Sequence, residues 1–195
     1  AWLREGHQVA WAHNAEDLSG GELCFYLSYG KVVDSRTLKK YKHNLVVHES
    51  DLPRGRGWSP MSWAILDGEN RIPVTLFEAA NRVDAGTIYL QEWIELTGYE
   101  LLPEWRNIQA RITAHLCRKF VALYPEVLAN GREQIGEPTY HKKRQARVSQ
   151  MSTNENLESQ FNLLRIVDNN RYPAFFEIEG RTFILRIDAP SSDRS

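Results

Sequence analysis

The sequence predicts an α/β fold with a largely parallel sheet. Short runs of β-branched and aromatic residues alternate with segments in which apolar residues recur every three or four positions. This alternation is typical of a sheet whose strands are connected by helices. At 195 residues the chain has the length of one domain with a small appendage, and a chain of this length buries roughly 70% of its unfolded surface.

Apolar and aromatic runs predict strands at 7–13, 22–30, 44–48, 72–79 and 86–96. Between the second and third of these, residues 35–42 are expected to form a short polar helix or turn. A helix is expected to begin at Pro60, because Ser59 is a favoured N-cap residue and proline is favoured at the first helical position. Gly68 suits the position just past the end of this helix.

The longest predicted helix begins at Pro103. Its apolar residues fall three or four positions apart and form one face: Trp105, Ile108, Ile112, Leu116, Phe120 and Leu123. Gly131 ends this region of the chain.

The composition and the apolar periodicity of the sequence change after Gly136. Residues 138–156 are polar and basic and have no period, so we expect a mobile loop there. A short helix at 157–167 and a hairpin at 174–187, turning at Glu179 and Gly180, follow. The chain is therefore divided into a main domain, residues 1–136, and a small α/β appendage, residues 137–195.

The composition excludes several classes of protein. The formal net charge is −1, which gives no broad electrostatic attraction to nucleic acid. No apolar run approaches the roughly 20 residues needed to cross a bilayer, so no membrane partner is expected. Cys24 and Cys117 stand alone in apolar stretches, without the spacing of a metal site. We expect both to be core residues of a cytoplasmic protein, with no metal bound.

Two ionisable residues stand just beyond predicted strands. His48 ends the strand 44–48, and Asp84 follows the strand 72–79. Ligands of open α/β sheets bind beyond the carboxyl ends of the strands. Taken alone, each residue has an ordinary explanation, because a histidine after a strand is most often a loop residue and Asp-x-Gly is most often a turn. The two predict a site only if their loops meet.

The stretch from Asn44 to Gln91 carries five motifs in a fixed order, HESDLP, GRGWSP, WAILDG, PVTLFEA and VDAGTIYLQ. In order, spacing and residue types it resembles the N10-formyltetrahydrofolate-dependent formyltransferases, a family that includes methionyl-tRNA formyltransferase and the sugar N-formyltransferases. FYLSYGKVV, residues 25–33, is similar to a strand and loop that bracket folate in this family. FNLLRIVDNNRYPAFFEIEGRTFIL, near the C-terminus, is similar to the appendage of the sugar-modifying branch.

The resemblance implies a formyltransferase-type Rossmann-like sheet with flanking helices, and residues 1–136 as the catalytic domain. The chain departs from the family pattern in two places. Val46 stands where the family usually carries an asparagine two residues before the histidine, and Asn44 lies too far along the strand to replace it. The first strand and first helix of the usual fold are also absent from this sequence.

The resemblance further implies that His48 and Asp84 are catalytic. The imidazole accepts a proton from the attacking amine or hydrogen-bonds to the oxyanion, and the carboxylate holds the imidazole. Tyr29 and Gly30 permit close approach of the main chain, so the folate is expected between their loop and the loop before Asp84. The residues expected to bind N10-formyltetrahydrofolate are Tyr29, Gly30, Phe77, Glu78, Ala79, Asn81, Val83 and Asp84.

The glycine-rich loop after His48 is the expected substrate site. Its backbone amides and arginines precede a helix N-terminus, where a phosphate can bind. The residues assigned to the substrate are Ser50, Arg54, Gly55, Arg56, Gly57, Trp58 and, from the basic stretch of the appendage, Arg144. A simple solvated basic loop remains the other interpretation of both segments.

Three function classes compete. The leading hypothesis is transfer of a formyl group to the amine of a nucleotide-linked amino sugar, of which a pseudaminic-acid-type sugar is one candidate, in surface glycan biosynthesis. The second is methionyl-tRNA formyltransferase, which the short tail and the net charge of −1 disfavour. The third is a catalytically impaired relative that binds folate or a nucleotide sugar, suggested by Val46. The sequence leaves open whether the protein is a monomer or a homodimer.

Overall fold

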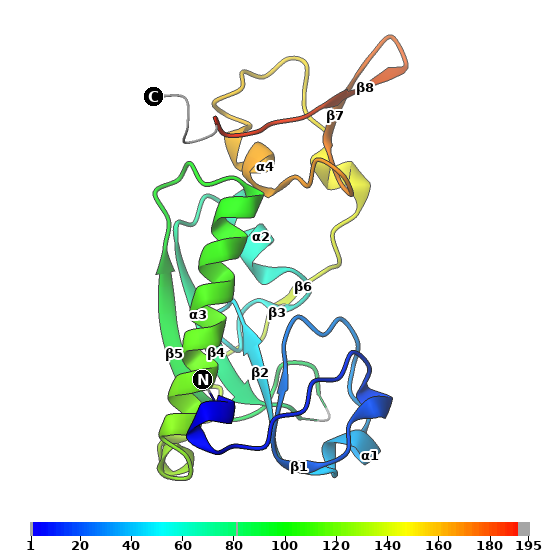
Figure 1. Cartoon of the computed structure of the whole chain (residues 1–195). Coiled ribbons are helices and arrows are strands. Elements are labelled where there is room, and N and C mark those ends of the chain that lie inside the picture. Colours follow the sequence, from blue (N-terminus) through cyan, green and yellow to red (C-terminus); the bar gives the residue numbers. More distant parts are fainter. Residues whose placement is uncertain (1, 81, 191–195) are drawn as a thin grey trace.

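The computed structural model of the protein describes residues 2–80 and 82–190, and it confirms the α/β class. Its central sheet has the strand order β1-β2-β4-β5 (Figure 1). The four strands are β1 (Gly21–Tyr26), β2 (Tyr41–His48), β4 (Arg71–Glu78) and β5 (Ile88–Glu95). Each lies within a few residues of a predicted strand.

The directions of the strands differ from the expectation of a largely parallel sheet. β1 and β2 run parallel, whereas β4 is antiparallel to both β2 and β5. Neighbouring parallel strands need a crossover connection of a dozen residues or more. The segment 79–87 between β4 and β5 is shorter than that, so the chain returns as a hairpin and the sheet is mixed.

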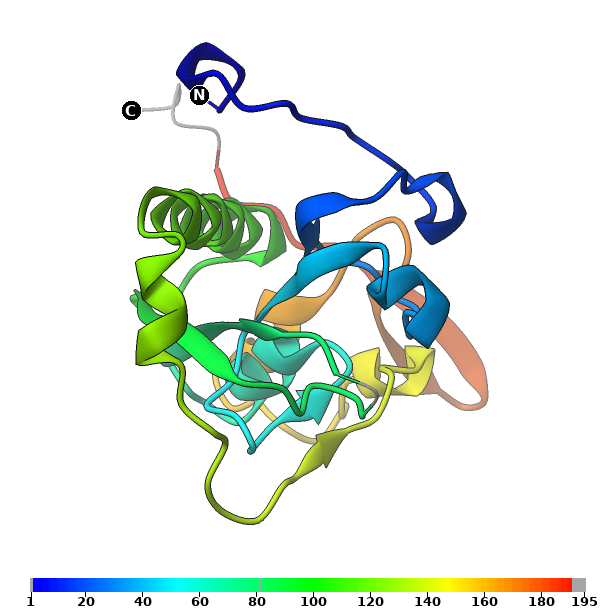
Figure 2. The same cartoon turned by 90° about the horizontal axis from the view of Figure 1, so that it is seen from below.

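The strand predicted at 7–13 does not form, and that prediction was wrong. These residues are extended and mostly exposed, between the short 3-10 helices η1 (Trp2–Glu5) and η2 (Ala15–Asp17). Figure 2 shows them running along one side of the molecule. Within the described part of the chain β1 pairs with β2 alone, and 7–13 joins no ladder. An apolar pattern without a neighbouring strand is insufficient to make a strand.

Three helices follow the predicted positions. α1 (Ser35–Leu38) is capped by Asp34, whose Oδ1 accepts a hydrogen bond from Thr37 N at 2.7 Å. α2 (Pro60–Leu66) begins at the predicted proline, but Ser59 has φ 51° and its side chain makes no cap hydrogen bond. α3 (Leu102–Ala122) is the long helix.

The main core lies between α3 and the sheet (Figures 1 and 2). Trp105, Leu116 and Phe120 of the predicted apolar face are fully buried against strand residues such as Leu45 and Leu76. Leu123, the last residue of the predicted face, is 44% exposed because the helix has already ended at Ala122. The α3 helix therefore buries its predicted stripe over most of its length.

The C-terminal part forms a second unit above the sheet in Figure 1. After η3 (Glu126–Asn130), β6 (Tyr140–His141) lies below this unit on the way to it. The elements of the unit are η4 (Ala146–Ser149), α4 (Phe161–Ile166), β7 (Ala174–Ile178) and β8 (Arg181–Leu185). A separate apolar cluster of Met151, Leu164, Val167 and Ala174 holds it together. The hairpin turns where predicted, with positive φ at Glu179 and Gly180. The boundary at residue 136 stays a prediction.

The predicted loop 138–156 contains a short strand that the sequence did not indicate. β6 pairs in parallel with β3 (Arg56–Gly57), in the glycine-rich loop after His48. In Figure 2 this small pair lies on the other side of the sheet from α3. The C-terminal part of the chain is thus bonded directly to the loop beside the predicted catalytic histidine.

Candidate active site

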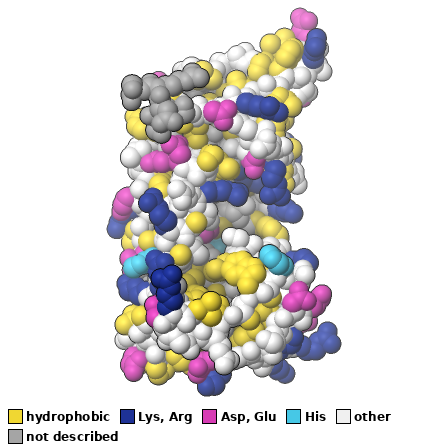
Figure 3. Space-filling model, in the orientation of Figure 1, with side chains coloured by type: hydrophobic (Ala, Val, Ile, Leu, Met, Phe, Trp, Pro, Cys, Tyr) yellow, Lys and Arg dark blue, Asp and Glu magenta, His cyan; other side chains and the backbone are white. Residues whose placement is uncertain are grey.

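A cleft of about 560 Å³ opens at the carboxyl ends of β1 and β2. Its walls come from the loop after β1, the end of β2, the start of α2, the segment 79–84 and one face of α3. On the face shown in Figure 3, hydrophobic side chains gather below the C-terminal unit, and Lys and Arg side chains lie beside them. The cleft therefore combines apolar walls with a cationic margin.

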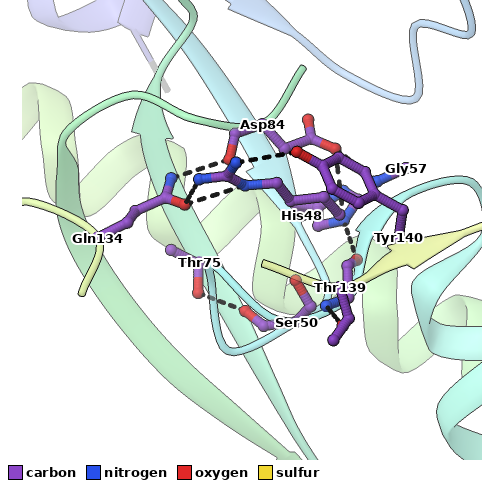
Figure 4. Close-up of polar contacts among 10 residues, drawn as sticks. His48, Ser50, Gly57, Thr75, Asp84, Gln134, Thr139 and Tyr140 are labelled. Carbon is purple, nitrogen blue, oxygen red and sulfur yellow. Dashed lines mark hydrogen bonds and ion pairs between the residues drawn. The ribbon is translucent and has the colours of Figure 1, made fainter. Parts of the chain in front are cut away.

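His48 and Asp84 meet in this cleft (Figure 4). His48 Nε2 lies 3.7 Å from Asp84 Oδ2, and both side chains are largely buried. His48 Nε2 also lies 2.9 Å from the carbonyl oxygen of Gly55, and Asp84 Oδ2 accepts a hydrogen bond of 2.8 Å from Gly57 N. A carbonyl oxygen only accepts, so Nε2 carries the proton and Nδ1 of the neutral imidazole is an acceptor.

The route by which Asp84 reaches His48 differs from the one expected. Since β4 is antiparallel to β2, its last residue, Glu78, pairs with Leu45 at a distance of three residues from His48. The segment 79–87 then folds back over the sheet toward His48. Gly86 permits this return, because a Cβ at that position would meet the carbonyl oxygen of Glu78 at 1.7 Å. The expectation that both loops leave the same edge of a parallel sheet was wrong.

The loop after His48 is fixed by the segment that contains β6. Gly55 N donates to Thr139 Oγ1 at 2.8 Å, and Trp58 N donates to the carbonyl of His141 at 3.1 Å. Gly57 has φ 100°, and a Cβ there would meet the His141 carbonyl oxygen at 2.5 Å, so only glycine fits. The loop is therefore held in one conformation by main-chain contacts.

Most residues predicted to bind the folate line the cleft. These are Tyr29, Gly30, Phe77, Ala79, Val83 and Asp84. Glu78 does not line it, because its carboxylate bonds to His43 Nδ1, Asn44 N and Tyr89 Oη. Asn81 lies outside the described residues. The binding roles themselves stay predictions.

The predicted substrate residues divide into two groups. Gly57 and Trp58 line the cleft, whereas Arg54 lies outside it and pairs with Asp51 at 3.2 Å. Ser50 is buried, with its carbonyl accepting from Thr75 Oγ1 and its own Oγ without a hydrogen-bond partner.

Gly55, Arg56 and Arg144 do not line the cleft. Each is hydrogen-bonded to another part of the protein instead. Gly55 supplies the carbonyl that contacts His48, and Arg56, 9% exposed, donates to Gln134 Oε1. Arg144 donates to the carbonyl of Ile166 at 2.7 Å, and burial lowers its pKa. The structure therefore does not place these three residues on the walls of the cleft.

Four further residues complete the margin of the cleft, and of these the sequence indicated only Lys143, in the basic stretch of the appendage. Arg106 and Gln109 come from α3, and Arg171 comes from the turn before β7. Lys143 Nζ lies 5.0 Å from the ring centre of Trp58, in a cation–π contact. No local motif marks Arg106, Gln109 or Arg171, because they reach the cleft only through the packing of α3 and the C-terminal unit.

His141 is a second histidine near His48. Its ring stacks on Trp63 with centroids 5.9 Å apart. Burial lowers the pKa of His141, and the charge of His48 acts in the same direction, while Asp67 opposes the shift.

Among the described residues no group of His, Cys, Asp and Glu side chains is arranged to hold a metal ion. No helix in that part of the chain is long and apolar enough to span a membrane.

Residues 8–110 match the family described as formyl transferase, which covers more than half of the chain. The chain belongs to the formyl transferase family. Human mitochondrial methionyl-tRNA formyltransferase is 30% identical over 146 residues, which are 73% of this chain and 38% of that protein. The region that matches covers less than half the length of these curated relatives.

Solved structures with the same fold include a 4-N formyltransferase from Francisella tularensis. It superposes with a TM-score of 0.68 at 18% identity, covering 91% of this chain and 75% of the other. HypX from Aquifex aeolicus in complex with tetrahydrofolic acid superposes with a TM-score of 0.62 at 19% identity, covering 85% of this chain and 29% of HypX. These likenesses show that the formyltransferase fold extends over most of the described residues.

Proposed function

We propose that the protein transfers a formyl group from N10-formyltetrahydrofolate to the amine of a nucleotide-linked amino sugar. The observation that carries the proposal is the contact between His48 and Asp84 in the cleft, with Nε2 and Oδ2 separated by 3.7 Å. A histidine held by a carboxylate is a common general base. Membership of the formyl transferase family supplies the reaction class.

In the proposed reaction the amine nitrogen attacks the formyl carbon, and the bond from that carbon to N10 of the folate breaks. His48 accepts the proton that the amine loses and passes it to N10. The Nδ1 nitrogen is the acceptor, since Nε2 donates to the carbonyl of Gly55. Asp84 stabilises the charged imidazole, and the Gly57 N–H keeps the carboxylate in place.

The folate donor fits the apolar part of the cleft. Phe77 and Val46 supply apolar walls, and the segment around Ala79 supplies main-chain groups beside them. A flat heterocycle suits a mostly apolar slot with few polar anchors. The complex of HypX with tetrahydrofolic acid, which has this fold, supports a folate ligand.

The cationic margin favours an acceptor that carries phosphate. Arg106 and Arg171 approach the cleft from two different elements, and Lys143 adds a third cation beside Trp58. Arginine is well suited to phosphate, because its guanidinium donates two parallel hydrogen bonds. A nucleotide diphosphate linked to an amino sugar carries both the phosphate and the amine. A pseudaminic-acid-type sugar remains one candidate, for surface glycan synthesis in the cytoplasm, and a homodimer stays a prediction.

Methionyl-tRNA formyltransferase is the second candidate, favoured by the names of the sequence relatives. The formal charge of −1 over the chain disfavours it, because RNA binding relies on a cationic surface. The third candidate, a catalytically impaired relative, rests on Val46. It lines the cleft two residues before His48, where the family carries asparagine.

The test is turnover of the purified chain with N10-formyltetrahydrofolate and a panel of nucleotide amino sugars, followed through folate absorbance. We expect turnover with at least one sugar, and a loss of about 10²–10⁴ in kcat for His48→Ala and for Asp84→Asn. Circular dichroism checks that both variants fold. Formylation of methionyl-tRNA alone would establish the second candidate, and binding of folate without any turnover would establish the third.

A further inference from the structure

Gln134 lies beside the loop that carries Asp84. Its segment follows η3 and is anchored to β5 by two hydrogen bonds of 2.9 Å between the main chains of Arg132 and Ile88. This anchor places Gln134 next to the segment that carries Asp84 and Gly86. Gln134 lies far from the motifs of the family in the sequence, so nothing in the sequence analysis indicated it.

The side chain of Gln134 makes hydrogen bonds at both ends of its amide (Figure 4). Its Oε1 accepts from Arg56 Nη2 at 2.6 Å and from Arg56 Nε at 3.3 Å. Its Nε2 donates to the carbonyls of Asp84 and Gly86, both at 2.9 Å. Guanidinium only donates and carbonyl only accepts, so this orientation of the amide is the one the contacts require.

Arg56, the partner of Gln134, lies between the two residues whose main chains contact the catalytic pair. Gly55 presents its carbonyl to His48, and Gly57 donates its N–H to Asp84. Arg56 is 9% exposed and also donates to Tyr140 Oη at 3.3 Å. One half-buried amide and one buried guanidinium thus connect the loop after His48 with the loop that carries Asp84.

Asp84 needs such support because its backbone is strained. Its φ is 50°, a left-handed conformation that costs a residue other than glycine about 1–3 kcal/mol. The strained conformation persists only when the surrounding contacts hold it. Gln134 bonds to the carbonyl of Asp84 itself and to the carbonyl two residues later, so it holds both sides of the strained turn.

We propose that Gln134 is a positioning residue that fixes the Asp84 carboxylate against His48 through its hydrogen bonds to the carbonyls of Asp84 and Gly86. The inference rests on the proposed function for its effect on turnover. A displacement of about 1 Å in a reacting group is enough to cost about 10²-fold in rate. We therefore expect Gln134→Ala to lower kcat by roughly 10- to 100-fold and to leave KM for N10-formyltetrahydrofolate within about twofold.

Two further variants separate positioning from general stability. Gln134→Glu keeps an acceptor for Arg56 but loses both N–H donors to the carbonyls, so we expect it to lose as much kcat as Gln134→Ala. Glu133→Ala changes the exposed neighbour of Gln134 and serves as the control, with kcat unchanged. Full kcat in Gln134→Glu would overturn the proposal.

A double-mutant cycle distinguishes a positioning role of Gln134 from a merely structural one. It compares the effect of Gln134→Ala on kcat in the wild type and in Asp84→Asn. If Gln134 acts through Asp84, adding Gln134→Ala to Asp84→Asn should change kcat by less than about twofold. If Gln134 serves the fold alone, its effect should be the same in both backgrounds, and the proposal would be wrong.

Amide hydrogen exchange tests the same inference without turnover. In the wild type Gly57 N donates to Asp84, while Arg56 N and Trp58 N donate to the β6 segment. We expect Gln134→Ala to speed exchange at Gly57 by about tenfold or more while the other two amides stay protected, since only the Asp84 contact is released. Unchanged exchange at Gly57 refutes the positioning role. Faster exchange at Gly57 in Gln134→Ala, together with a wild type that shows no formyl transfer, would support the positioning and reject the proposed function.

Discussion

Val46 stands where the resemblance to the family implies an asparagine, and the structure shows what surrounds it. Val46 lines the cleft and packs against the small apolar cluster of Leu52, Phe77 and Ile88. The upstream asparagine, Asn44, is engaged elsewhere, because it accepts from Tyr26 Oη and donates to the carbonyl of Leu38. Asn44 therefore does not supply the missing amide to the cleft.

We predict that Val46→Asn raises kcat by about tenfold or more. An amide at this position faces the open cleft on the same strand face as His48, and losing an oxyanion donor typically costs about 10²–10³ in rate. Steady-state kinetics with the nucleotide sugar found active in the panel measures the change.

Val47→Asn is the matched control for this substitution. Its side chain lies on the strand face opposite to His48, where it packs on the main core at the edge of the cleft, so the same amide should lower stability without raising kcat. A folded Val46→Asn protein with unchanged kcat would show that another donor already serves the oxyanion.

The residues of the site differ in how well the sequence could indicate them. His48 and Asp84 sit in short motifs whose spacing carries the signal, so the sequence indicates both as candidates. Gln134 and Arg171 reach the site from distant segments with no motif of their own. Side-chain contacts over such sequence separations depend on packing, which local patterns do not encode.

At the scale of elements, the segment 79–87 determines whether the site forms. It leaves β4 at the end of the sheet away from His48 and returns through Gly86, which lies against the carbonyl of Glu78. The strands themselves followed from the apolar pattern. Their directions did not, because apolar alternation is the same in parallel and antiparallel pairs and only connection length distinguishes them.

We predict that Gly86→Ala destabilises the protein by about 1–3 kcal/mol or more, as overpacking of a tight contact does. The added Cβ meets main chain at 1.7 Å, so the segment must shift and carry Asp84 away from His48. Urea unfolding and kcat measure the two effects.

Gly30→Ala is the stability control for Gly86→Ala. A Cβ at residue 30 meets only the Trp58 ring, at an ordinary 3.4 Å, so its free energy of unfolding should change little. Full stability and full kcat in Gly86→Ala would contradict the structure of this segment.

At the scale of the whole molecule, a buried arginine joins the C-terminal unit to the main sheet domain. Arg165 of α4 has no exposed surface, and its Nη2 lies 3.5 Å from Glu100 Oε2 just before α3. Burial lowers the pKa of Arg165, and the Glu100 carboxylate opposes that shift. Trp105 Nε1 also donates to the Arg165 carbonyl at 2.9 Å. Arg165 Nε donates to the carbonyl of Glu100 at 3.4 Å as well. One charge pair and two hydrogen bonds thus tie the unit that carries Arg171 to Glu100 and to α3.

We predict that Glu100→Gln destabilises the protein by roughly 3 kcal/mol, because breaking a buried ion pair leaves an uncompensated charge and costs about 3–5 kcal/mol. Glu95→Gln is the matched control. Glu95 pairs with Arg71 at 2.9 Å, but their side chains are 66% and 62% exposed. Such surface pairs contribute about 0–1 kcal/mol.

Chemical denaturation compares the two Glu→Gln variants, and limited proteolysis within residues 131–150 reports detachment of the C-terminal unit. We expect faster cleavage only in Glu100→Gln, together with a higher KM for the nucleotide sugar, since Arg171 loses its position at the cleft. Equal stability of the two variants would show that the apolar contacts between α2 and α4 suffice to hold the unit. In that case the buried pair would matter for orientation alone, and KM, rather than the free energy of unfolding, would be the quantity that distinguishes Glu100→Gln from its control.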